Sequence, residues 1–177
     1  MSEKIHQMLD TVYLACIWIS GMSILGMSLI IPWGIFARYV LGSGSSWPEP
    51  VAVLLMVIFT FFGAAATYRA GGHIAVGMLT DRLPAGLQWL CAKLVDLLMM
   101  LVCVFVMIWG SQLSMEMMRQ GLAELPWLPV GYTYLPLPIG SFLTLLFVLE
   151  NTFAGSQADR AVVTYDHETA DITPEPL

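Results

Sequence analysis

Residues 11–37, TVYLACIWISGMSILGMSLIIPWGIFA, decide the fold, because they contain no charged residue. A helix of roughly 20 apolar residues crosses the ~30 Å hydrocarbon core of a bilayer, and this run is longer than that. It is also much longer than the apolar core of about 7–15 residues in a secretory signal, and no clear small-x-small cleavage site follows it. We therefore expect a membrane-spanning helix that is retained.

Three further charge-free runs follow, at residues 50–68, 97–115 and 125–149. Glycine, proline and charged residues separate the runs, as is typical of loops. The runs are continuously apolar and do not alternate, which excludes a β-barrel. We therefore predict an all-α integral membrane protein with four transmembrane helices and a short interfacial helix between the second and third. The predicted spans lie at approximately 12–36, 48–70, 88–115 and 132–153.

Composition supports this fold class. Hydrophobic residues make up 58% of the 177-residue chain and charged residues 11%, with a mean hydropathy of +0.76; a soluble domain carries about 25% charged residues. Residues 155–177 account for −4 of the net charge of −6. We predict a membrane domain over residues 1–154 and an acidic, disordered tail over 155–177. Without a basic patch, nucleic-acid binding is excluded.

The orientation follows from the lysines and arginines near the span ends, which are more frequent on the cytoplasmic side. With a cytoplasmic N-terminus, that side holds five basic residues and the other side holds two, Arg38 and Arg119. The five are Lys4, Arg69, Arg82, Lys93 and Arg160. We therefore expect both termini in the cytoplasm.

The first connection, residues 38–49, is polar. Ser46-Trp47-Pro48-Glu49 fits the S-x-x-E capping box, in which the serine and the glutamate satisfy backbone N–H groups at the start of a helix. Glu49 can cap this helix, pair with Arg38 across the loop, or do both. Trp47 is expected to anchor the helix at headgroup depth.

The second span contains small residues and ends in basic ones. Residues 63–66, Gly-Ala-Ala-Ala, form a small-residue patch, centred on Ala64 and Ala65, at which another helix can approach closely. Arg69 and His73 share one face if the helix continues, but Gly71-Gly72 leaves a loop equally open. Residues 73–84 are modestly amphipathic and form the predicted interfacial helix.

These motifs together resemble a known family. Arg38-Tyr39, a glycine-bearing turn, Trp47 and Glu49 precede Gly-Ala-Ala, and Arg69-x-x-x-His73-Ile-x-Val and Leu-Pro come next. ELPWLPVGYTYLPLPIG then opens the fourth span. In this order, over about residues 8–154, they resemble the small membrane subunit (DctQ-type) of tripartite ATP-independent periplasmic (TRAP) transporters. The chain differs at Pro50 and Gly77, where the family often has an acidic residue.

The resemblance implies a non-enzymatic subunit without catalytic residues, cofactor or metal. Such a subunit sits in the bacterial inner membrane and braces a large membrane subunit. The large subunit carries an organic acid with sodium, and a periplasmic binding protein delivers it. Arg38, Trp47, Glu49, Arg69 and His73 carry over as matched positions and, with Ala64 and Ala65, are our candidate interface or structural residues. We expect the Arg38–Glu49 cluster at the large subunit, near the periplasmic surface.

Two other classes of membrane protein are less well supported. A haem-binding anchor needs histidines inside the spans, whereas His6, His73 and His167 lie outside the span centres. A stand-alone four-helix exporter needs a membrane-embedded carboxylate. Asp96, Glu116 and Glu150 all lie near span ends, and the first two have a basic residue three positions away.

The predicted orientation has a direct test. A cysteine introduced at Ser43 should react with an impermeant thiol reagent in intact cells, and one introduced at Ser156 should not. The reverse labelling pattern would overturn the orientation.

Overall fold

The structure is a computed structural model, which describes residues 3–43, 46–71, 85–122, 125 and 127–154. The predicted interfacial helix, His73 and the predicted acidic tail lie outside these residues. The described chain forms helices α1 (Glu3–Tyr39), α2 (Pro48–Arg69), α4 (Ala85–Met117), α5 (Gly131–Tyr134) and α6 (Pro136–Ala154).

Four helical segments are long and apolar enough to cross a bilayer. They are Ile5–Tyr39, Pro48–Arg69, Leu90–Met117 and Gly131–Thr152. Outside the helices, the described part of the chain has one isolated β-bridge, between Gly121 and Pro129. The predicted all-α membrane fold with four spans is therefore confirmed. The last charge-free run is only partly helical, because the chain before Gly131 forms the loop that contains this bridge.

Glycine ends α2. Gly71 has a φ of 72°, in the left-handed region that favours glycine, and its N–H donates to the carbonyl of Tyr68 at 3.1 Å. The helix thus stops at Arg69, four residues before His73, which lies outside the described residues. Of the two readings of the Gly71-Gly72 pair, the helix break is the correct one.

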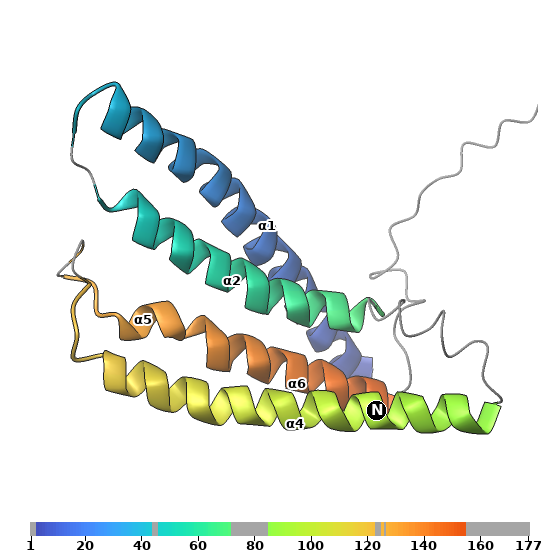
Figure 1. Ribbon diagram of the computed structural model, residues 1–177. Helices are drawn as coiled ribbons and strands as arrows, with labels where there is room; N and C mark the ends of the chain where they lie inside the picture. The colour runs from blue at the N-terminus through green and yellow to red at the C-terminus, as the bar shows by residue number, and fades with distance from the viewer. Residues whose placement is uncertain (1–2, 44–45, 72–84, 123–124, 126, 155–177) are drawn as a thin grey trace, which may run out of the picture.

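The helices lie in the order α1, α2, α6 and α4, a row that α1 crosses obliquely, so that its N-terminal part reaches α6 (Figure 1). α2 packs against α1 on one side and α6 on the other, and α6 packs against α4 (Figure 1). Only α2 and α6 therefore have a long helix on both sides. In the most apolar stretch of each span, 6% of the residues are buried in α4, 17% in α1 and in α2, and 33% in the α5–α6 span. The two edge helices consequently present most of their apolar side chains to lipid or to another protein.

The buried core lies toward one end of this row. Its members come from α1, α2 and α6 and are Leu9, Tyr13, Cys16, Ala65, Ala66, Tyr68, Phe147 and Val148. We call this the Arg69 end, because α2 finishes there; the opposite end, where α1 joins α2, is the Arg38 end. The core therefore joins the helices at the Arg69 end.

A group of buried and partly buried polar side chains crosses three helices at the Arg69 end. Arg69 Nε and Nη2 donate to the two carboxylate oxygens of Glu150 on α6, at 2.8 and 3.0 Å. Arg69 Nη2 also donates to Asp10 Oδ1 on α1 at 2.6 Å, and His6 Nδ1 lies 3.1 Å from Glu150 Oε1. The Arg69 and Glu150 side chains are 1% and 0% exposed. We call His6, Asp10, Arg69 and Glu150 the Arg69 network.

The Arg69 guanidinium also lies between two aromatic rings. Its Cζ is 5.3 Å from the ring centroids of Tyr13 on α1 and Phe147 on α6. A cation over an aromatic face is attracted by the ring electrons, most strongly where water is excluded. The rings therefore help to hold a charge that is costly to bury. The remaining nitrogen, Nη1, is buried without a hydrogen-bond partner.

The neighbouring residue joins the fourth helix. Tyr68 donates its hydroxyl to Asp96 Oδ1 on α4 at 3.0 Å, and Asn151 on α6 donates to the same oxygen at 3.1 Å. Thr152 reaches Asp96 Oδ2 at 3.4 Å, and Lys93 lies 3.7 Å from it. Asp96 therefore does more than pair with Lys93, the simple interpretation from the sequence. Tyr68 and Arg69 together connect α2 to all three other long helices.

A glycine sets the distance between α2 and α6. A Cβ added to Gly140 would lie 2.6 Å from Phe61 Cβ and 3.1 Å from the Phe61 backbone carbon. No side chain fits in this space unless the helices separate. Small residues allow such close approach between helices in membranes, where van der Waals packing replaces the hydrophobic drive.

The buried ion pair should matter far more than an exposed one. Arg69→Met leaves the Glu150 and Asp10 carboxylates without their cation, which should lower the free energy of unfolding by roughly 3–5 kcal/mol. The matched control is Arg38→Met, which removes an exposed pair and should cost about 0–1 kcal/mol. Unfolding of the purified chain in mixed micelles, followed by circular dichroism, measures both. Equal effects of the two substitutions would contradict the assigned burial.

The contact at Gly140 gives a second stability prediction. Gly140→Ala should destabilise the chain by about 1–3 kcal/mol through overpacking, although alanine is the better helix former. Gly21→Ala is the control, because a Cβ there meets nothing within 4 Å. The same unfolding assay should show no loss for Gly21→Ala. A stable Gly140→Ala variant would mean that α2 and α6 lie further apart.

Candidate functional site

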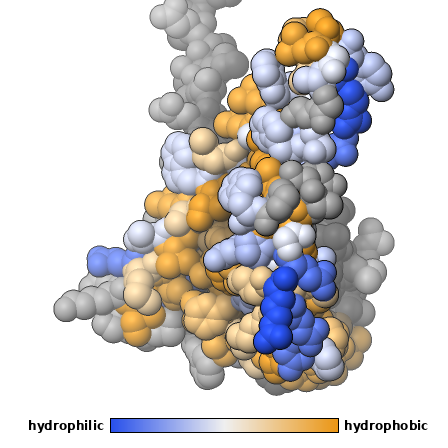
Figure 2. All heavy atoms as spheres, turned by 90° about the vertical axis from the view of Figure 1, so that its left-hand side faces the viewer, coloured by the Kyte–Doolittle hydropathy of each residue, from blue (hydrophilic) through white to orange (hydrophobic). Residues whose placement is uncertain are grey.

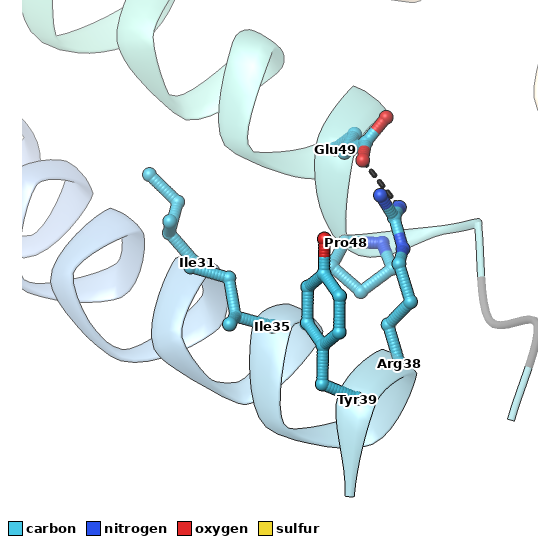
Figure 3. Close-up of a pocket in the computed structure, with 7 residues that line it drawn as sticks. Ile31, Ile35, Arg38, Tyr39, Pro48 and Glu49 are labelled. Atoms are coloured by element: carbon cyan, nitrogen blue, oxygen red, sulfur yellow. Dashed lines mark hydrogen bonds and ion pairs between the residues drawn. The ribbon is translucent and has the colours of Figure 1, made fainter. Parts of the chain in front are cut away.

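The Arg38 end holds the first candidate residues. Arg38 lies in the last turn of α1 and Glu49 in the first turn of α2, and Arg38 Nη2 pairs with Glu49 Oε1 (Figure 3). The two side chains are 50% and 69% exposed. The structure therefore brings together the arginine and the glutamate that the sequence placed on either side of one loop.

The predicted capping box at this loop is wrong. The residue that caps α2 is Trp47, its backbone is already helical with φ −67° and ψ −27°, and it makes no side-chain cap hydrogen bond. A serine cap requires an extended backbone at the position just before the helix, and Ser46 lies one residue too early. The Glu49 carboxylate instead pairs with Arg38.

A groove lies beside this ion pair. Its cavity volume is about 110 Å³, and it is lined by Ile31, Gly34, Ile35, Arg38, Tyr39, Pro48 and Glu49. Ile31 and Ile35 lie on consecutive turns of α1, while Arg38, Tyr39 and Glu49 surround the end nearer the loop (Figure 3). The groove is thus apolar on the membrane side and polar toward the connection.

The tip of the hairpin exposes apolar residues next to these charges. Tyr39, Val40 and Leu41 are 80%, 66% and 59% exposed, and Trp47 is 38% exposed. Viewed from this end, hydrophilic residues form separate patches with hydrophobic residues between them (Figure 2). Trp47 therefore lies with its ring partly exposed at the end of a span, a position that suits an interfacial anchor.

The small-residue patch on α2 is divided between two environments. Ala65 is fully buried in the core, at 0% exposure, whereas Ala64 is exposed. A Cβ at Gly63 would lie 3.1 Å from Ser20 Oγ on α1. Neighbouring residues of a helix point about 100° apart, as 3.6 residues make a turn. Ala65 therefore packs within the four-helix unit, and only Ala64 is available to another protein.

Arg69, another matched position, lies in the Arg69 network and far along α2 from the Arg38–Glu49 pair. The last matched position, His73, is outside the described residues. The sequence interpretation missed Asp10, Tyr68 and Glu150 as partners of this end. One signal was available: with the predicted orientation, Asp10, Arg69 and Glu150 all fall at the cytoplasmic ends of their spans.

The described residues contain no group of three or more His, Cys, Asp or Glu side chains placed to hold a metal ion. The polar side chains that the helices bring together form ion pairs and hydrogen bonds with one another. Such an arrangement can hold helices in place and present a surface to a partner.

Known proteins resemble this chain in sequence. The family model of the DctQ component of tripartite ATP-independent periplasmic transporters matches residues 27–158. A protein of Haemophilus influenzae named as a TRAP transporter small permease protein is 29% identical over 117 residues, which cover 66% of this chain and 72% of that protein. The ectoine TRAP transporter small permease protein of Halomonas elongata is 27% identical over 112 residues, 62% of this chain. The matched segment spans 58% of the Halomonas protein, less than two thirds of its length.

The family match covers well over half of the chain, including the Arg38–Glu49 hairpin, the Arg69 end of α2 and the whole of α6. The resemblance seen in the motifs is thereby confirmed. The chain belongs to the DctQ component family and is a multi-pass small membrane subunit of the TRAP type.

Proposed function

We propose that this chain braces the large membrane subunit of a TRAP transporter while that subunit takes up an organic acid together with sodium. A periplasmic binding protein delivers the acid. The chain lies in the bacterial inner membrane with both termini in the cytoplasm. The Arg69 end then faces the cytoplasm, and the Arg38 end faces the periplasm, where the binding protein arrives.

The observation that carries this proposal is how the buried charges are used. Asp10, Arg69, Glu150 and Asp96 all bond to groups on neighbouring helices of the same chain. Charges that bind a transported ion or substrate in a membrane face a cavity or a pathway. These four instead hold the helices together, which favours a support over a carrier.

The exposed faces of the edge helices favour a large apolar partner. Among the exposed residues are Trp18 and Leu29 on α1, at 70% and 73%, and Leu101 and Trp109 on α4, at 62% and 59%. Lipid can cover such a surface, and so can a membrane subunit with complementary packing. In a row of helices a partner gains contact along the full length of a helix, which suits a brace.

The Arg38–Glu49 pair and Trp47 are proposed to lie at the periplasmic edge of this interface. A partner that covers the exposed pair would bury it, so removing one member would leave the other charge buried alone. Arg69 has a different role in this proposal: it fixes α2 within the brace and does not touch the partner.

Two adjacent alanines separate assembly from stability. Ala64→Leu enlarges an exposed position of α2 and should reduce co-purification of the large subunit, while the small subunit alone unfolds as the wild type does. Ala65→Leu overpacks the core and should lower the free energy of unfolding by about 1–3 kcal/mol. The assay is affinity capture of the tagged small subunit from native membranes, together with unfolding of the purified chain.

In the same capture assay, Glu49→Ala should reduce the yield of large subunit and Arg69→Met should reduce the folded small subunit itself. Normal capture with Ala64→Leu would show that the outward face of α2 is not in the interface. The transport part is tested in proteoliposomes: both membrane subunits and the binding protein should accumulate a radiolabelled organic acid only with an inward sodium gradient. Transport by this chain alone would overturn the bracing role.

A further inference from the structure

We infer that the groove between α1 and α2 at the Arg38 end binds one phospholipid whose headgroup carries a phosphate and a primary ammonium. This inference goes beyond the bracing role: in the assembled transporter the lipid would lie at the edge of the interface, so that its headgroup and the large subunit together cover the Arg38–Glu49 pair. The phosphate would meet Arg38, the ammonium would meet Glu49, and the first part of one acyl chain would lie along Ile31 and Ile35.

The depth of the groove suits a lipid headgroup. Arg38 directly follows the charge-free residues 11–37 of α1, and Glu49 lies one residue inside the start of α2. A helix rises 1.5 Å per residue, so a turn such as Ile35 to Arg38 covers about 5 Å. The apolar walls of the groove therefore lie at hydrocarbon depth and its polar rim at headgroup depth, one to two turns away. A phospholipid changes from apolar chains to polar headgroup over a similar distance.

The shape of the groove comes from a tight contact beside it. A Cβ on Gly34 would lie 2.9 Å from Pro48 Cβ, so α1 and α2 already touch there. Next to this contact Ile31 and Ile35 are 48% and 56% exposed and form an apolar wall. A cavity of about 110 Å³ cannot hold a whole phospholipid, but it can hold the glycerol region and the first methylenes of one chain.

The charges at the rim select the headgroup. One cation and one anion, side by side, complement a zwitterion and give no net attraction for an anionic lipid. The Arg38–Glu49 bond uses one guanidinium nitrogen and one carboxylate oxygen. Guanidinium has five N–H donors and binds phosphate in a forked geometry. Because both side chains are at least half exposed, other Arg38 N–H groups and Glu49 Oε2 are within reach of a headgroup.

A choline headgroup would fit less well. Its quaternary ammonium has no N–H to donate, so it cannot make the charge-assisted hydrogen bond to Glu49 that an ethanolamine makes. A glycerol headgroup has no cation for Glu49. The groove therefore predicts an order of affinity, with phosphatidylethanolamine ahead of phosphatidylcholine and phosphatidylglycerol of the same acyl chains.

The test is native mass spectrometry of the purified full chain in detergent, titrated separately with these three lipids. The first molecule of phosphatidylethanolamine should bind roughly tenfold more tightly than the other two, the scale of one charge-assisted hydrogen bond. Glu49→Gln should abolish this preference and keep phosphatidylglycerol binding unchanged or stronger. Arg38→Gln should weaken phosphatidylethanolamine binding by roughly tenfold.

Two variants complete the design. Ile35→Trp fills the groove and should weaken the first binding step while leaving the rim charges in place. Arg119→Gln is the matched control, an exposed arginine in the other connection on the same predicted side, and should change nothing. Circular dichroism of each variant reports that it is folded.

Several results would overturn the inference. Equal affinity for the three headgroups, or equal loss with Arg38→Gln and Arg119→Gln, would mean surface lipid only. Displacement of the bound lipid by millimolar inorganic phosphate would mean an anion site without lipid selectivity. The large subunit is absent from the assay, so failure here leaves the bracing role untouched, and failure of capture with Ala64→Leu leaves the lipid site untouched.

Discussion

The rest of the structure depends on one buried interaction, the fork of Arg69 on the Glu150 carboxylate. In lipid the apolar faces of helices gain little by leaving the solvent for each other, so packing and polar contacts must bring them together. An arginine in such a place is costly unless its charge is met. Here Glu150 meets it from α6 and Asp10 from α1, which positions three helices around one side chain.

The adjacent residue extends this constraint to the remaining helix. Tyr68 and Arg69 are consecutive, and consecutive side chains leave a helix in different directions. One therefore reaches Asp96 on α4 while the other reaches Glu150 and Asp10. Because both are in the last turn of α2, the polar contacts and the buried core lie at the same end of the row. At the Arg38 end, α1 and α2 meet through Gly34 and Pro48, with a groove beside them.

The sequence predicted the four membrane-spanning helices, because the lipid environment determines them. The charge-free runs gave four helices because a chain in hydrocarbon must satisfy its backbone internally, and Gly71 marked the end of α2 through its left-handed conformation. The Arg38–Glu49 pair was among the predicted options, because the two residues are only eleven positions apart. The capping box failed because a local motif does not fix the residue at which a helix begins: α2 begins at Pro48, so Trp47 and not Ser46 is its cap residue. The difference between Ala64 and Ala65 also lay beyond the sequence, since it depends on which way α2 is turned in the row.

The Arg69 network could not be predicted from the sequence, for a different reason. Its bonded pairs are separated by 59 to 144 positions, and no motif relates them. Only the topology, which returns α2 and α6 to the side where α1 begins, places them together. These long-range bonds also connect the two helical hairpins. Local contacts hold each hairpin, α1 to α2 and α4 to α6 through the α5 turn, and α2 packs against α6 between the hairpins, most closely at Phe61 and Gly140. The bonds from Arg69 to Glu150 join the two hairpins, and the bonds to Asp10 and Asp96 reach α1 and α4 at the two edges. A sliding or hinge motion between the hairpins would therefore break buried charge pairs, and this resistance is what the proposed bracing role requires.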